Sequence, residues 1–163
     1  MIDGVRHYYD DNGNLYRKDK DLLPCNEYVI NGYTYKTDEK ARIVSAEGQL
    51  YMKDRDHRLT IKDPMDDVGK GDQQEGDDRG HLIGDQFNGS NGLENLIPQD
   101  SDINRVGFRK FENSLAEQVK AGRTVYVSIK PVYGGGSRRP SAIAIKYSID
   151  GKKYRRIFPN GKG

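Results

Sequence analysis

Three turn dipeptides, each between segments rich in strand-forming residues, most constrain how this chain of 163 residues can fold. They are Asn12-Gly13, Asn31-Gly32 and Asp150-Gly151. A two-residue hairpin turn needs a positive φ at both positions, which Asn, Asp and Gly tolerate better than other residues. The chain is therefore predicted to build antiparallel β-structure from hairpins at both of its ends.

The segments beside these turns predict the strands. Stretches rich in tyrosine, valine, isoleucine and threonine occur at residues 7–17, 27–30, 33–36, 41–46, 95–99, 124–130, 141–148 and 152–158. These residue types favour strands because branched and aromatic side chains pack well on a pleated surface. Pro98 is expected to end the 95–99 strand, since proline has no N–H to donate to a ladder.

One helix is predicted from residue 101 or 102 to about residue 121. Ser101 or Asp102 would be its N-cap, because a short side-chain oxygen can accept a hydrogen bond from the free N–H groups of the first turn. Apolar residues at spacings of three and four form one stripe, made of Phe108, Phe111, Leu115 and Val119. Gly122 stands where a helix commonly ends on a left-handed glycine.

The net charge of +2 hides a strong asymmetry along the chain. Residues 1–78 hold 12 Lys and Arg against 18 Asp and Glu, a net charge of −6. Residues 79–163 hold 15 against 7, a net charge of +8. A basic half of this kind indicates a polyanionic partner, most often nucleic acid, or else a solvated face that keeps the protein in solution.

Three short motifs follow one another in the middle of the chain. They are Asp78-Arg79-Gly80-His81, Asn95-Leu96-Ile97-Pro98-Gln99 and Asp102-Ile103-Asn104, with Glu112 eight residues beyond Asn104. In their strand, loop, strand, helix setting they resemble the motifs of the DNA/RNA non-specific endonucleases of the ββα-metal superfamily. The resemblance covers about residues 77–130. It looks most like the nuclease domains at the C-terminal ends of secreted bacterial toxins.

The fold that the resemblance implies is α+β, an antiparallel β-sheet carrying a ββα-metal finger. The length suits a single nuclease domain. Its parts are expected to be a hairpin-rich N-terminal part at 1–62, an acidic loop at 63–78, the ββα-metal core at 79–121 and C-terminal β-strands at 122–163. The loop holds seven acids and one lysine. It is expected to be a solvated linker, or a flap that competes with nucleic acid for a basic cleft.

His81 is the candidate general base. Hydrolysis of a phosphodiester needs a base that takes a proton from water, and the ordinary pKa of histidine suits that task near neutrality. The resemblance assigns the role to His81, while the alternative for an isolated histidine is a structural one. Gly80 is expected to leave room for the phosphate backbone to approach.

Asn104 and Glu112 are the candidate metal-site residues. The resemblance implies one Mg²⁺, with Mn²⁺ as a substitute, bound through the Asn104 side chain and completed by water and phosphate oxygens. Glu112 lies about 80° around an ideal helix from Asn104, so it would reach the water shell of the metal. The alternatives are a first-turn hydrogen bond for Asn104 and a surface pair with Arg109 for Glu112.

Further residues of the motifs are assigned supporting roles. Arg79 is grouped with His81 and Glu112 as catalytic, and would contact either the phosphate or a carboxylate such as Asp78. Asn95 would line the metal site and support the hairpin, or close the turn before its strand.

One position departs from the pattern that the resemblance implies. Some members carry an arginine four residues after the helix glutamate, and here that residue is Ala116. Either another cation neutralises the phosphate in its place, or none does. The candidates are Arg138, Arg139, Arg155 and Arg156, and their alternative role is a basic face at the sheet edge.

The sequence therefore predicts a Mg²⁺-dependent endonuclease that acts on DNA, RNA or both and leaves a 5′ phosphate. It would be the toxic part of a larger secreted toxin, delivered into target cells and neutralised by an immunity protein. The alternative is a nucleic-acid-binding module without catalysis. The first residues do not form a signal peptide. No stretch reaches the roughly 18 apolar residues of a spanning helix, so membrane insertion is not expected.

Overall fold

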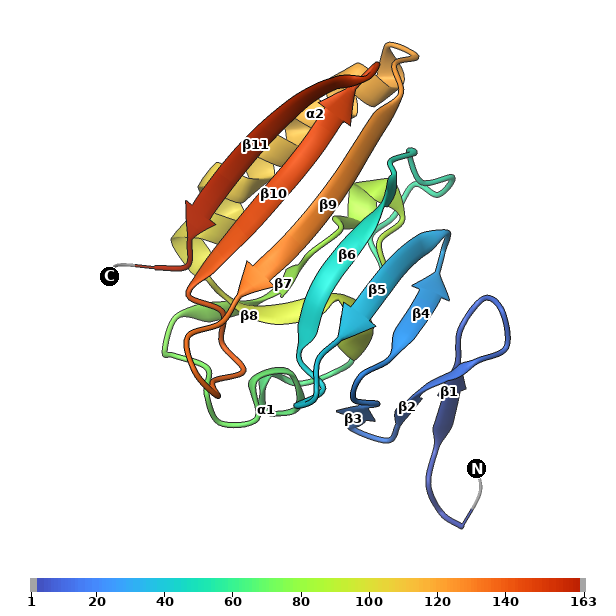
Figure 1. The fold of residues 1–163 in the computed structure, drawn as a ribbon, viewed down its shortest axis with the longest axis vertical. Helices are drawn as coiled ribbons and strands as arrows, with labels where there is room; N and C mark the ends of the chain where they lie inside the picture. The colour runs from blue at the N-terminus through green and yellow to red at the C-terminus, as the bar shows by residue number, and fades with distance from the viewer. Residues whose placement is uncertain (1–2, 162–163) are drawn as a thin grey trace.

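A six-stranded antiparallel sheet forms the centre of the protein, which the computed structural model describes over residues 3–161 (Figure 1). Its order is β11-β10-β9-β6-β5-β4. The bounds are β4 Glu27–Ile30, β5 Tyr33–Thr37, β6 Ile43–Gln49, β9 Val125–Val132, β10 Ala142–Ile149 and β11 Lys152–Pro159. A smaller sheet joins β1 (His7–Tyr9), β2 (Leu15–Lys18) and β3 (Asp21–Leu22) near the N-terminus. The predicted α+β class is confirmed.

The hairpin turns explain the order of the strands. Asn31-Gly32 joins β4 to β5 with φ of 56° and 85°, and Asp150-Gly151 joins β10 to β11 with φ of 49° and 86°. The turn at Asn12-Gly13 differs, because only its glycine has a positive φ. There the carboxylate of Asp10 accepts hydrogen bonds from the N–H groups of Asn12 and Asn14 and shapes a longer loop.

A strand, strand, helix unit carries the motifs. β7 (Asp77–His81) pairs antiparallel with β8 (Leu96–Asp100), so that His81 lies opposite Leu96 at the end of the ladder. Pro98 stands inside β8 and does not end it, because the two-stranded ladder leaves one edge of β8 without a partner strand. Two 3₁₀ turns, Asp85–Phe87 and Leu93–Asn95, lie in the connection between the two strands.

The helix after β8 begins with a wide turn. Residues Ile103–Phe108 wind as a π-helix and continue into α2, Arg109–Lys120. Asp100 caps the segment by accepting the N–H of Ile103, so the predicted N-cap at Ser101 or Asp102 is wrong by one or two positions. Gly122 follows the helix with a φ of 83°, as predicted.

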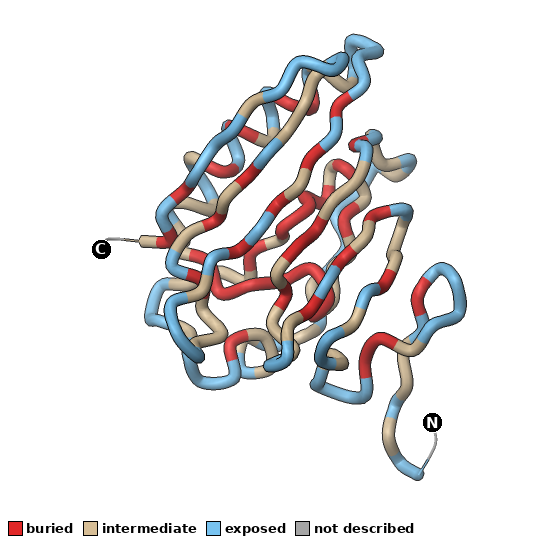
Figure 2. Tube along the Cα trace, in the orientation of Figure 1, coloured by how far each residue is buried: buried red, intermediate tan, exposed pale blue. Residues whose placement is uncertain are grey.

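The core lies between α2 and one face of the sheet. The predicted stripe of Phe108, Phe111 and Leu115 is buried, and Val119 packs at its border. It covers the inward residues of β9 and β10, among them Val125, Val127, Ile129, Ile143 and Ile145. Figure 2 shows this buried layer and the exposed residues that alternate with it along the strands. The opposite face of β9–β11 carries no helix (Figure 1).

Residues 63–78 differ from the linker or flap expected of them. They contain a short helix α1 (Met65–Gly69) and the first residues of β7. Three of their carboxylates form ion pairs with arginines from other parts of the chain, namely Asp63 with Arg17, Asp77 with Arg139 and Asp78 with Arg105. The acidic segment is therefore part of the packed fold. Among residues 3–161, no helix has the length and apolarity to cross a membrane.

Candidate active site

A cavity of about 470 Å³ opens between β7, the π turn, α2 and the loop before α1. It brings together five predicted site residues, which are Asp78, Arg79, His81, Asn104 and Glu112. Further lining residues are Lys53, Arg58, Ile61, Gly84, Asp85, Gln86, Arg105, Arg109 and Asn113. The predicted motifs, up to 34 positions apart in sequence, thus meet in one place.

His81 ends β7 with its ring in the cavity wall. Its Nε2 is buried and has no hydrogen-bond partner among the described residues. Burial lowers the pKa of His81 to about 4, helped by the positive charges of Arg58, Arg55 and Arg79 and opposed by Asp85. The imidazole is therefore neutral at pH 7 and holds a free lone pair, which a proton acceptor requires. A structural histidine of similar burial would normally have its ring nitrogens hydrogen-bonded.

Asn104 lies in the π turn beside β7. Its Nδ2 donates to Oδ2 of Asp78 at 2.9 Å, and its Oδ1 accepts no hydrogen bond from the described residues. Asp78 is fixed in turn by Arg105, whose Nη2 is 2.7 Å from Oδ1. These hydrogen bonds outweigh burial and lower the pKa of Asp78. Asp78 therefore fixes the amide nitrogen of Asn104 and leaves the amide oxygen free.

Glu112 projects from the first turn of α2 into the same cavity. Burial raises the pKa of its carboxyl to about 8, although Arg58, a hydrogen bond from the Gly84 backbone and Arg109 act in the opposite direction. Glu112 and Arg109 form no ion pair, so the alternative of a surface pair between them does not hold. A Cβ at position 84 would overlap Oε2 of Glu112, so a side chain there would displace the carboxyl from its present position. A π-helix turns through a smaller angle per residue than an α-helix. The angle between Asn104 and Glu112 around the helix axis is therefore smaller than the predicted 80°.

The donor set suits a hard cation that keeps most of its water. The described residues hold no cluster of three or more His, Cys, Asp or Glu side chains that would form a complete metal cage. A free amide oxygen and an unpaired carboxyl in one cavity nevertheless match Mg²⁺, which is often bound by one or two protein oxygens together with water and phosphate. Residues Asn104 and Glu112 thus fit such an ion.

Arg79 contacts neither Asp78 nor any other carboxylate of the described residues at hydrogen-bond distance. Its Nη1 donates to the carbonyl oxygens of Ile61 at 3.3 Å and Asp63 at 3.0 Å. The guanidinium therefore fastens the loop before α1 to the cavity wall, and its positive charge lies near His81.

Asn95 lies outside the cavity, although it was expected to line the metal site. Its side chain is fully buried. Its Oδ1 accepts the N–H of Ile83, and its Nδ2 donates to the carbonyls of Ile83 (2.8 Å) and Ser90 (2.7 Å). Asn95 therefore stabilises the loop that follows His81, which agrees with the supporting part of its predicted role.

Asn95→Ala is expected to destabilise the fold by at least about 2 kcal/mol, because it leaves two buried backbone groups and a partly buried one without their partner. For a chain of this size the melting temperature should fall by about 4–8 °C, which calorimetry in EDTA would measure. The exposed Asn12→Ala is the matched control and should change the melting temperature little. Equal effects of the two substitutions would contradict the role of Asn95.

Gly80 serves packing and not phosphate approach. A Cβ at this position would lie 2.7 Å from Cβ of Gln99, the buried neighbour from the paired strand. The expectation that Gly80 makes room for the phosphate backbone is therefore wrong.

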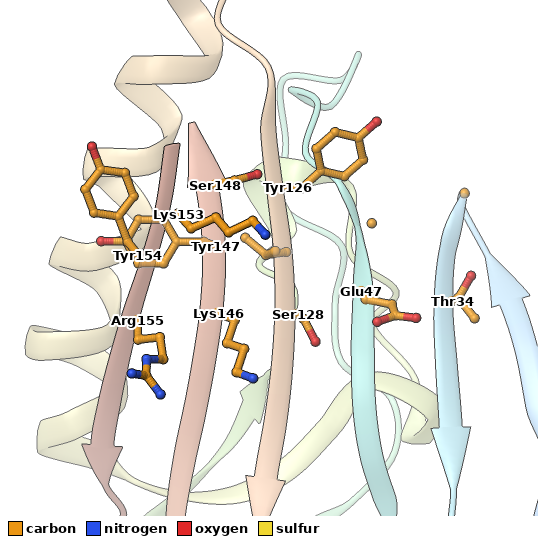
Figure 3. A pocket seen from close by; sticks show the side chains of 13 residues that line it. Thr34, Glu47, Tyr126, Ser128, Lys146, Tyr147, Ser148, Lys153, Tyr154 and Arg155 are labelled. Carbon is orange, nitrogen blue, oxygen red and sulfur yellow. The ribbon is translucent and has the colours of Figure 1, made fainter. Parts of the chain in front are cut away.

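The four arginines proposed to replace the one missing at Ala116 do not line the cavity. Arg139 is paired with Asp77, and Arg138 donates to the carbonyl of Lys40. Arg156 stacks over Phe158 at 4.6 Å, and Arg155 lies on the far face of the sheet (Figure 3). The positions of charged residues in a sequence do not show on which face of the sheet each side chain lies. The prediction that one of these four arginines replaces the missing one at the cavity is therefore wrong.

Three other arginines line the cavity and were missed, and one of them, Arg105, is paired with Asp78. The other two are Arg58 and Arg109, and neither forms an ion pair with a carboxylate of the described chain. Nearby Asp85 is instead held by Lys53 and Arg55. Arg58 follows an irregular, charged stretch at residues 53–57. Nothing in this part of the sequence indicates that Arg58 lies near His81. Ala116 is buried in the core, so its position cannot hold a guanidinium.

A family model described as DNA/RNA non-specific endonuclease matches residues 24–151. The "Type VII secretion system protein EssD" of Staphylococcus aureus (strain USA300) is 34% identical over 148 residues, which cover 85% of this chain and 24% of that protein. The "Probable deoxyribonuclease RhsA" of Dickeya dadantii (strain 3937) is 34% identical over 85 residues, covering 52% of this chain and 6% of that protein. The chain thus spans a quarter or less of the length of these relatives.

Solved structures share the fold. The "Structure of Sda1 nuclease with bound zinc ion" superposes with a TM-score of 0.57 and 19% identity, covering 80% of this chain and 76% of that one. An "extracellular endonuclease" superposes with a TM-score of 0.55 and 18% identity, covering 100% of this chain and 93% of that one. At identities of 18–19%, the similarity to these structures shows a shared fold.

Proposed function

Because this chain belongs to the DNA/RNA non-specific endonuclease family, we propose that its cavity hydrolyses phosphodiester bonds with His81 as general base and Mg²⁺ bound at Asn104. The observation that carries the proposal is the buried Nε2 of His81, which has no hydrogen-bond partner within residues 3–161, in one cavity with Asn104 and Glu112. Family membership supports an enzyme over the non-catalytic binding module.

His81 would accept the proton of the attacking water. Its neutral ring and free Nε2 suit that step, because a base must be unprotonated before the reaction begins. The neighbouring arginines favour the neutral form of the ring and attract the anionic phosphate to it. The attack would break the bond to the 3′ oxygen and leave a 5′ phosphate.

Asn104 and Glu112 would hold the metal site. The amide oxygen of Asn104 would bind the cation, and Glu112 would accept hydrogen bonds from its water shell. When bound, Mg²⁺ supplies positive charge that stabilises the transition state and the leaving oxygen. Asp78 would position Asn104 through its hydrogen bond. Gly84, which has no side chain, would leave space for the carboxyl of Glu112.

Arg58 and Arg109 would bind the phosphate in place of the arginine missing at Ala116. Both guanidinium groups line the cavity without a carboxylate partner, so they are free to form bidentate contacts with a phosphate. Arg79 would contribute its charge from the cavity wall.

Removal of divalent metal is expected to abolish cleavage of plasmid DNA and of RNA. EDTA should reduce activity to background, Mg²⁺ should restore it and Mn²⁺ should substitute, because amide and carboxylate oxygens favour hard cations. Zn²⁺ should restore much less activity. The measurement is a digestion assay on both nucleic acids at pH 7. Full activity in EDTA would refute the metal site, and full activity with Zn²⁺ alone would refute the choice of Mg²⁺.

We further propose that this domain is the toxic part of a larger secreted protein. The names of the two relatives, a type VII secretion system protein and a probable deoxyribonuclease, support delivery and nucleic acid as the target. A producing cell would then need an immunity protein, and an acidic one would complement Arg58, Arg105 and Arg109 at the cavity. Loss of bacterial viability on induced expression is the readout.

A further inference from the structure

The sheet face opposite α2 carries a second basic surface. We call it the outer basic face and define it by Tyr126, Lys130, Lys146, Lys153 and Arg155. All five residues are exposed, and those on β9 and β10 alternate with buried or partly buried residues on the face that packs against α2. A shallow hollow of about 800 Å³ lies over four of them (Figure 3).

The charges of this face are not balanced within the sheet. Strands β9, β10 and β11 contain no carboxylate, and the four cations form no ion pair with any described residue. Lys146 lies directly opposite Arg155 in the register, an arrangement of like charges that destabilises a strand pair. One acid of the neighbouring strand β6, Glu47, lies across from Ser128 and lines the same hollow. An anion bound to the face would relieve this repulsion.

We propose that the outer basic face binds a second stretch of nucleic acid, distinct from the stretch being cut. This inference rests on the proposed function in one respect, which is that the ligand is nucleic acid. Phosphates would contact Lys130, Lys146, Lys153 and Arg155, and a base would stack on the exposed ring of Tyr126, which is 51% accessible.

The composition of the face favours nucleic acid over an acidic protein. The centres of protein–protein interfaces are depleted in lysine, whereas Lys146 stands on β10 between the two flanking strands. Clustered Lys and Arg on one face, with an aromatic ring among them, are typical of nucleic-acid contacts. Because α2 and the cavity lie on the other side of the sheet, only a long or folded nucleic acid reaches both surfaces.

The test is the triple variant Lys146→Gln/Lys153→Gln/Arg155→Gln, with binding measured in EDTA. For a single strand of about 60 nucleotides we expect about tenfold weaker binding and a smaller salt dependence, by about one unit of log–log slope per lost phosphate contact. With Mg²⁺, cleavage of an oligonucleotide of about 8 nucleotides should be unchanged, since it would occupy the cavity alone. The control Lys18→Gln/Lys20→Gln/Lys120→Gln removes the same charge from other exposed positions and should bind the long strand more tightly than the test variant.

Two results would overturn the proposal. One is a triple variant that binds the long strand as tightly as the control variant. The other is unchanged binding to nucleic acid with lost binding to polyglutamate, which would assign the face to an acidic protein. If the triple variant does not fold, the single changes Lys146→Gln and Tyr126→Ala replace it. A wild-type chain that binds the long strand but fails to cut the short one would refute the proposed function alone.

Discussion

Replacing His81 by alanine is expected to slow phosphodiester hydrolysis by about 10²–10⁴-fold, the usual contribution of a general base. The alanine removes the free Nε2 of the cavity and leaves Asn104, Glu112 and the arginines in place. The measurement is kcat on a defined oligonucleotide with saturating Mg²⁺ at pH 7. The same change should abolish the loss of viability on expression in bacteria.

His7→Ala is the matched control for this prediction. The ring nitrogen Nδ1 of His7 forms a hydrogen bond with the carbonyl oxygen of Val5, at the small N-terminal sheet. Removing the His7 ring should therefore leave kcat near the wild-type value. A His81→Ala enzyme that retains more than about a tenth of the wild-type rate would rule out general-base catalysis by this residue. Melting curves of both variants would show whether a loss of rate reflects unfolding.

Replacing Glu112 by glutamine is expected to have opposite effects on stability and activity. In the metal-free fold the pKa of Glu112 is about 8, whereas its ordinary value is 4.5. Between these two pH values the unfolded chain releases a proton that the folded chain keeps, so the wild-type protein loses stability as the pH rises. Glutamine has no proton to release. The variant should therefore melt higher than the wild type at pH 8, by about 2–6 °C, and by much less at pH 4.5.

The activity of Glu112→Gln should fall about tenfold or more, because a neutral amide orders the water of a cation less well than a carboxylate does. The exposed Glu117→Gln on the same helix is the control, and neither its stability nor its activity should change. Melting curves in EDTA at pH 4.5, 6 and 8 measure the first effect. A variant whose melting temperature stays below that of the wild type at pH 8 would contradict the raised pKa of Glu112.

The strands and the helix could be predicted from local sequence signals, because each of these signals depends on a few neighbouring residues. The Asn31-Gly32 and Asp150-Gly151 turns need only their own backbone conformation, and the structure confirms both. The apolar stripe on α2 likewise follows from helical spacing. The motifs placed Asp78, Arg79, His81, Asn104 and Glu112 in one group, and the fold brings them to one cavity.

Features that depend on tertiary contacts were not predicted. The π turn at Ile103–Phe108 has no marker in the sequence, although it sets the relative orientation of Asn104 and Glu112. The side of the sheet on which Arg155 lies depends on strand register. Arg58 reaches the cavity from an irregular segment that no periodicity describes.

The ion pairs of the acidic segment also limit how this domain can be recombined with its relatives. Asp77 and Arg139 are nearly excluded from solvent, with side chains 2% and 10% accessible. A chimera that takes the C-terminal strands from one relative and residues 63–78 from another must match these two positions. A mismatch leaves one buried charge alone, at a cost of about 3–5 kcal/mol. The two segments therefore have to be exchanged together, although more than 40 residues of sequence separate them.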